Sequence, residues 1–74
     1  MKQATILQPD IMDEEFDMSD FHHTELCDII EHCLDVYYEM TTFQPGRKKF
    51  RDKLNEVIDE YNERRDFNAF RNIN

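Results

Sequence analysis

One turn signal, Gln44-Pro45-Gly46, divides this chain into two stretches with helical periodicity and limits the folds that it can adopt. Gly46 is the only glycine in 74 residues, and Pro9 is the only other proline. Neither stretch is therefore interrupted by a helix breaker. Two long helices joined by a short turn fold back on each other, so the sequence predicts an all-α protein built on an antiparallel helical hairpin.

The first helix is predicted over residues 20–40, with Ser19 or Asp20 as its N-cap. Apolar residues recur in it every three or four positions, which places them on one helix face. This row consists of Leu26, Ile30, Cys33, Tyr37 and Met40. Because further apolar residues flank the row on both sides, we expect the helix to be covered on more than one side.

The second helix is predicted over residues 47–64, where the apolar row repeats the same spacing. This row consists of Phe50, Leu54, Val57 and Tyr61. After Arg64 the apolar residues fall out of phase with the row. We therefore expect Asp66 to cap a short third helix, Phe67–Arg71, that closes one end of the hairpin.

The segment before the hairpin is rich in acidic residues. We expect residues 1–19 to form an extended, acidic and partly ordered N-terminal arm, and residues 20–74 to form a single helical domain. Thr5-Ile6-Leu7 is predicted to be a short extended piece, because Pro9 prevents a helix from continuing through it. The apolar residues between 10 and 20 are expected to dock onto the hairpin or onto a partner.

Charge is distributed unevenly along the chain, whose formal net charge is −8. Residues 1–40 hold eleven acidic residues and one basic residue, whereas residues 41–74 hold six acidic and eight basic residues. Polar residues of the first helix lie along one stripe: Glu25, Asp28, His32, Asp35 and Glu39. A dense negative face steers a protein towards a basic surface and speeds association.

These features are typical of a small acidic protein–protein interaction module that acts as a regulator or inhibitor of a host or partner protein. Accessory proteins of phages and mobile elements offer an analogy. Aromatic anchors dominate interface energies, so acidic and aromatic residues together are expected to contact the partner. The predicted contact residues are Asp13, Glu14, Glu15, Phe16, Asp17, Asp28, Asp35, Tyr37, Tyr38, Glu39, Phe67 and Phe70.

Two other functions fit the same sequence. Wide apolar helix faces predict self-association, so the chain is expected to be a homo-oligomer such as a dimer, and a self-assembling structural protein is the first alternative. The second alternative is a DNA mimic, or a nucleic-acid-associated protein that uses the basic run Arg47–Lys53. Nucleic-acid binding is the less favoured of these, because the basic run is short and the chain as a whole is acidic.

His23 and Cys27 are candidate metal ligands, because they lie four residues apart and share one face of the predicted helix. Zinc needs two further ligands, and His32 and Cys33 point away from this pair. Cys27 and Cys33 are too far apart on a helix for a disulfide. We therefore expect no metal and no other cofactor, and two free thiols of the kind found in a reducing compartment.

Enzyme activity is not expected. A cysteine nucleophile needs an oriented base, an oxyanion site and a pocket that excludes water, and a hairpin with one glycine offers no loop for them. The chain has no apolar run near the ~20 residues that a membrane span needs. No secretory signal follows Met1 either, so we expect a cytoplasmic location and no membrane partner.

Overall fold

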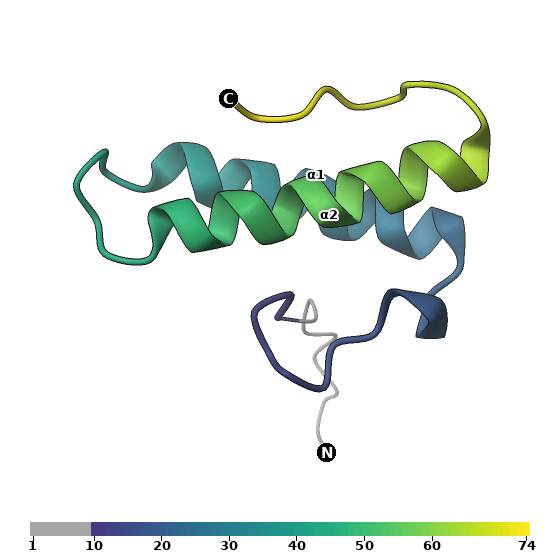
Figure 1. Cartoon of the computed structure of the whole chain (residues 1–74), viewed down its shortest axis with the longest axis horizontal. Coiled ribbons are helices and arrows are strands. Elements are labelled where there is room, and N and C mark those ends of the chain that lie inside the picture. The colour runs from purple at the N-terminus through teal and green to yellow at the C-terminus, as the bar shows by residue number, and fades with distance from the viewer. Residues whose placement is uncertain (1–9) are drawn as a thin grey trace, which may run out of the picture.

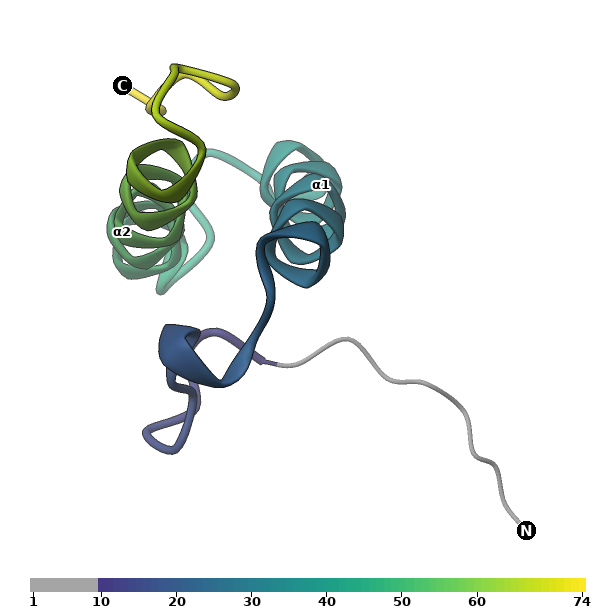
Figure 2. The ribbon, with the colours of Figure 1, turned by 90° about the vertical axis from the view of Figure 1, so that its right-hand side faces the viewer.

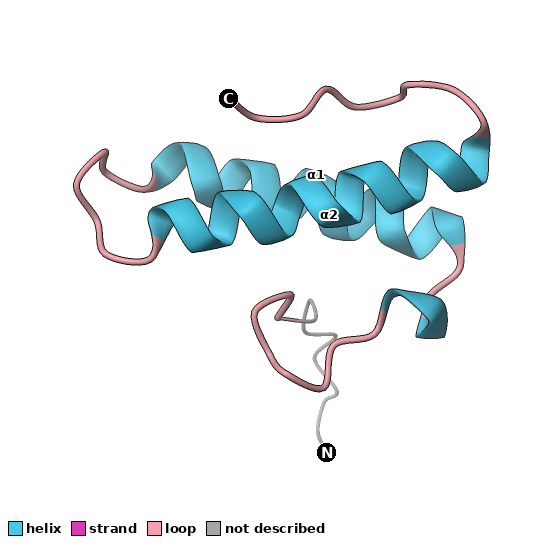
Figure 3. Cartoon of the chain, viewed as in Figure 1, coloured by secondary structure: helices cyan, strands magenta, loops and turns pink. Residues whose placement is uncertain are grey.

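Two helices form the framework of this protein. The computed structural model describes residues 10–74, in which a short 3₁₀-helix η1 (Met18–Asp20) precedes helices α1 (His23–Glu39) and α2 (Arg47–Arg65). α1 and α2 lie side by side and run in opposite directions (Figure 1). All remaining described residues are turns or extended chain, with no strand among them (Figure 3). The predicted all-α helical hairpin is confirmed.

The N-terminal end of α1 differs from the prediction. Ser19 and Asp20 belong to η1, whose cap is Asp17, and the extended backbone at Phe21 separates η1 from α1. The N-cap of α1 is His22: its Nδ1 accepts a hydrogen bond from the backbone N–H of Thr24, and its own N–H donates to Oε1 of Glu25 at 2.8 Å. This reciprocal capping satisfies orphan donors of the first turn, so α1 begins three residues later than predicted.

Left-handed backbone marks both ends of α2. Gly46 has φ +85° at the N-cap, a conformation that glycine adopts without steric cost. Asp66 has φ +60° at the C-cap, where its N–H donates to the carbonyl oxygens of Asn62 and Glu63. Asp66 therefore ends α2 and does not start another helix. The third helix predicted over Phe67–Arg71 is wrong, and these residues run as irregular and extended chain beside α2.

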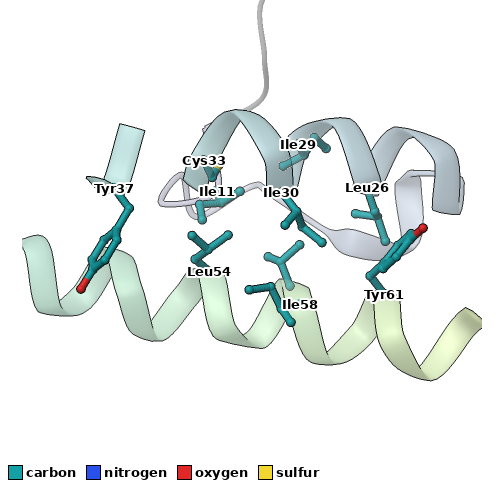
Figure 4. Packing of buried hydrophobic residues seen from close by; sticks show 10 residues of the cluster. Ile11, Leu26, Ile29, Ile30, Cys33, Tyr37, Leu54, Ile58 and Tyr61 are labelled. Atoms are coloured by element: carbon teal, nitrogen blue, oxygen red, sulfur yellow. The ribbon is translucent and has the colours of Figure 1, made fainter. Parts of the chain in front are cut away.

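The core lies between the two helices, where the predicted apolar rows meet (Figure 4). Four of the five residues in the first row are buried, as are three of the four in the second. Ile29 and Ile58 widen the contact, and Ile11 enters it from the N-terminal segment with only 1% of its surface exposed. The buried set is Ile11, Leu26, Ile29, Ile30, Cys33, Tyr37, Leu54, Val57, Ile58 and Tyr61.

The N-terminal segment folds as turns on one side of the hairpin. Asp13 N–H donates to the Asp10 carbonyl and Phe16 N–H to the Asp13 carbonyl, both at 3.0 Å, so residues 10–16 are not the extended arm that was predicted. Ile11 lies in the core and Phe16 and Met18 pack against it, so these three side chains contact the hairpin, whereas Met12 is 44% exposed. The predicted extended piece Thr5-Ile6-Leu7 lies outside the described residues.

Flanking segments cover the hairpin on two sides. The N-terminal segment lies on one side of the helix pair, and the residues that follow α2 lie on the other (Figure 2). Phe70 and Ile73 of the second segment pack against the core. Uncovered apolar helix faces were the basis for predicting a homo-oligomer. Because the chain's own segments cover much of these faces, that basis is weakened, and self-association stays a prediction.

Candidate functional site

The outward side of α1 carries a row of exposed carboxylates that ends in an exposed tyrosine. We call this row, Asp28, Glu31, Asp35 and Tyr38, the α1 stripe. Its members follow one another at spacings of three, four and three residues, so they share one helix face. Tyr38 is 68% exposed at the end of the row. The structure therefore places three predicted contact residues together and adds Glu31, which the sequence-based set omits.

None of the acidic residues 10–40 pairs with a cation in the part of the chain that the structure describes. The three ion pairs found there lie within α2: Arg51–Asp52, Lys53–Glu56 and Arg64–Glu60. The positive charges of α2 are thus partly neutralised by its own carboxylates. The carboxylates of α1 have no such partner and are screened only by solvent and salt. A field of one sign therefore surrounds the α1 stripe.

Several acids of the N-terminal segment have a structural role. Asp10, Asp13 and Asp17 each accept the N–H of the second following residue at 2.9 Å, which closes three successive turns. The backbone and hydroxyl hydrogen bonds from Ser19 lower the pKa of Asp17. Two of the predicted contact residues, Asp13 and Asp17, therefore shape the segment itself.

Glu14 and Glu15 are exposed beside these turns, and Glu39 is exposed at the last position of α1. Their carboxylates add to the negative surface. They carry no structural role of the kind that Asp13 and Asp17 have in the described hydrogen bonds.

Tyr37 is not available to a partner, which corrects one predicted contact. Its side chain is only 3% exposed and its ring lies 6.5 Å from that of Phe50. The guanidinium of Arg47 covers it at 4.0 Å from the ring centre. Tyr37 belongs to the apolar row that faces α2, whereas its neighbour Tyr38 is turned by about 100° and faces solvent.

The remaining predicted aromatic contacts divide into packed and exposed side chains. Phe16 stacks on Phe21 and Phe70 meets Tyr61 edge-on, each at 5.5 Å between ring centres, and both are half-buried. Phe67 is 54% exposed. It follows α2 at the far end of the hairpin from Tyr38, so Phe67 and the α1 stripe form separate surfaces.

Phe43 is an exposed aromatic residue that sequence reasoning missed. It lies in the turn between the helices and is 93% exposed. Gln44 N–H donates to the Thr41 carbonyl at 3.0 Å, which closes a tight turn whose third residue is Phe43. A large apolar residue that belongs to neither helical row, within the only predicted turn, was the available signal.

The basic run Arg47–Lys53 does not form one continuous patch. Arg47 lies against Tyr37, Arg51 is half-buried beside Asp52, and Lys53 lies 3.8 Å from a Glu56 oxygen. Within the basic run, only Lys48 and Lys49 are exposed. Three of the five basic residues that the nucleic-acid alternative requires therefore already contact other side chains of this chain.

The histidines and cysteines do not assemble a metal site. His23 Nε2 lies 3.1 Å from Nη1 of Arg65, and arginine is always a donor, so this nitrogen accepts and the ring is neutral. Loss of hydration, together with the positive neighbours His22, Arg65 and Arg64, lowers the pKa of His23. Both cysteines are free thiols. Across residues 10–74, no three His, Cys, Asp or Glu side chains converge as metal ligands.

The chain was also compared with known proteins. It matches no protein-family model, and neither the curated proteins nor the solved structures gave a match. Within the described residues, neither helix combines the length and the apolar character needed to cross a bilayer. Function is therefore inferred from the side chains described above.

Proposed function

We propose that this protein binds another protein through the α1 stripe and thereby regulates or inhibits it. One observation carries the proposal: three carboxylates without a cation partner in the described chain lead to a tyrosine that is 68% exposed, all on one helix face. The complementary surface is basic and contains an apolar pocket that accepts the tyrosine ring.

The carboxylates and the tyrosine contribute differently to such an interface. Exposed carboxylates with no cation partner raise the rate of encounter with a basic surface, and salt weakens this effect. A tyrosine supplies apolar contact area and one polar group at a small cost in conformational entropy, so it contributes to slow dissociation. The rigid helix holds both in fixed relative positions, which favours a single orientation of the partner.

Charge reversal on matched positions of the two helices tests the proposal. The stripe variant Asp28→Lys/Asp35→Lys and the control variant Glu56→Lys/Glu63→Lys change the same number of exposed charges at the same seven-residue spacing. Each immobilised protein is exposed to extract of its own cells at about 0.05 M and about 0.5 M salt, which changes the screening length severalfold.

We expect one partner to be retained by the wild type and by the control at low salt, and to be lost from the stripe variant. Tyr38→Ala is expected to lose the same partner at both salt concentrations. Equal retention of that partner by the stripe variant and the control would contradict the proposal.

A further inference from the structure

Two asparagines of α2 hold the residues that follow the helix by their main chain. Asn62 Oδ1 accepts the N–H groups of Ala69 and Phe70 at 3.0 and 3.3 Å, and its Nδ2 donates to the Phe70 carbonyl at 2.9 Å. Asn55 Oδ1 accepts the N–H of Ile73 at 2.7 Å, and its Nδ2 donates to the Ile73 carbonyl at 3.0 Å. Each carboxamide thus binds both polar groups of one backbone residue.

The spacing of the two asparagines along α2 matches the spacing of residues in an extended chain. Asn55 and Asn62 are seven residues apart, which is about 10.5 Å along an α-helix. Phe70 and Ile73 are three residues apart, which is about 10 Å along an extended chain. The two carboxamides therefore meet an extended peptide at every third residue without strain. Because they bind backbone groups, they do not require a particular residue at those positions.

Side chains add selectivity to the backbone contacts. The Phe70 ring meets Tyr61 edge-on at 5.5 Å, and Ile73 packs half-buried against the core. Between them, Asn72 Nδ2 donates to Oδ1 of Asp59 at 3.0 Å. The bound pattern is an aromatic residue followed, three positions later, by an aliphatic residue, with a hydrogen-bond donor just before the latter.

Two further contacts lie at the start of the segment: the Phe67 N–H donates to the Asn62 carbonyl at 3.3 Å, and the Arg65 guanidinium lies 5.5 Å from the centre of the Phe67 ring. None of the ten buried core residues lies beyond Tyr61. A hollow of about 840 Å³ lies along α2 beside the first part of the segment, lined by Glu63, Phe67 and Arg71 among others. Asp66 joins the segment to α2 in a left-handed conformation that is uncommon for a residue with a side chain. Release of residues 67–73 therefore leaves the contact between α1 and α2 in place.

We propose that this face of α2 is a binding site for an extended segment of another protein, and that residues 69–73 are its occupant within the chain. We call the site the asparagine face and define it as Asn55, Asp59, Tyr61 and Asn62. The segment it accepts carries an aromatic residue and, three positions later, an aliphatic residue. This site lies on the other helix from the α1 stripe and does not depend on it.

A synthetic peptide with the sequence of residues 67–74, acetylated and labelled with a fluorophore, is the probe. The protein is the full chain carrying Phe70→Ser/Ile73→Ser, whose own segment has lost both side-chain anchors. We expect the peptide to bind this variant about tenfold more tightly than the wild type, where the site is filled in most molecules. A peptide with serine at the same two positions is expected not to bind. Equal affinity for variant and wild type would overturn the proposal.

Removal of the carboxamides tests the site itself. Asn55→Ala/Asn62→Ala, added to the anchor variant, is expected to abolish peptide binding. Lys49→Ala/Glu56→Ala, at exposed positions of α2 with the same spacing, is expected to preserve it. Alanine favours helix in both variants, and circular dichroism checks that α2 persists. Peptide binding that survives loss of both asparagines would overturn the assignment.

A measurement on the unaltered protein avoids any question of folding. With ¹⁵N-labelled wild type and unlabelled peptide in excess, hydrogen exchange of the Phe70 and Ile73 amides is expected to rise as the peptide displaces the segment. Bound peptide with unchanged exchange at these amides would place it elsewhere and refute the proposal. If the wild type is a dimer and the peptide converts it to monomers, the asparagine face binds a second copy of this chain. That result would contradict a different protein as the occupant.

Discussion

Arg64 donates a 2.6 Å hydrogen bond from Nη1 to the backbone carbonyl oxygen of Phe21. Its Nη2 donates to the Met18 carbonyl at 2.8 Å, and its Nε donates to Glu60 at 2.7 Å. One side chain of α2 therefore holds the first residue of η1 and the residue that follows η1, and a carboxylate one turn away orients it.

Arg64→Ala is predicted to destabilise the protein by about 1–2 kcal/mol, because hydrogen bonds from a charged donor are lost at a partly screened site. Urea unfolding measures the free energy of unfolding, and amide exchange between residues 18 and 22 reports local loosening. Arg71→Ala removes an exposed arginine beyond α2 and serves as the control. If both variants unfold at the same urea concentration, Arg64 does not anchor the segment.

Ile11 belongs to the core although it lies outside the hairpin. Because its side chain is 1% exposed, Ile11→Ala should cost about 2–4 kcal/mol of unfolding free energy through lost burial and the cavity left behind. Met12→Ala, at a neighbouring exposed position, should change it by less than about 0.5 kcal/mol. Similar urea midpoints for the two variants would show that the N-terminal segment does not contribute to the core.

The two thiols are predicted to react at different rates. Burial, with a smaller contribution from the negative charge of Asp10, raises the pKa of Cys33 to about 11, so at pH 8 this thiol is almost entirely protonated. Cys27 is only half-buried. Iodoacetamide at pH 8 should therefore modify Cys27 first, and Cys33 only when urea unfolds the chain. Mass spectrometry of peptides counts each product, and equal rates in the folded state would contradict the burial of Cys33.

Acidification is predicted to destabilise the protein through His23. The pKa of His23 is lowered in the folded state, so the unfolded chain binds this proton more tightly. Its contribution is complete above the unfolded pKa of about 6.5 and is lost as the pH falls towards the folded value.

The difference in urea midpoint between pH 7.5 and pH 5.5 should therefore be smaller for His23→Asn than for the wild type. Thr42→Ala, at an exposed position without a titrating side chain, is the control and should leave the wild-type difference unchanged. An identical pH difference in His23→Asn and the wild type would refute the role of His23.

The helices were predictable because local spacing determines them. The apolar rows of residues such as Leu26 and Leu54 run with helical period, and Gly46 provides the single left-handed turn between them. Helix bounds agree to within three residues at the start of α1 and one residue at the end of α2. The same rows already assign Tyr37 to the core, so its selection as a partner contact disregarded its own periodicity.

Features that depend on distant residues were not predictable. Asn62 takes backbone groups of Ala69 and Phe70 that a third helix would have used, and no pattern near Phe67 signals this competition. Ile11 enters the core because successive turns of the N-terminal segment bring it back onto the hairpin. The outward position of Tyr38 follows from helix phase. That neither flanking segment covers it could be seen only in the structure.

Photo-crosslinking at position 38 tests the central claim most directly. A photoreactive phenylalanine analogue replaces Tyr38 in the full chain, and the same group at Lys49, an exposed position of α2, is the control. Illumination in living cells is predicted to join the position-38 protein to one partner, and to leave the position-49 protein uncoupled. The α1 stripe would not be the binding surface if position 38 gave no product, or if both positions gave the same products at equal yield.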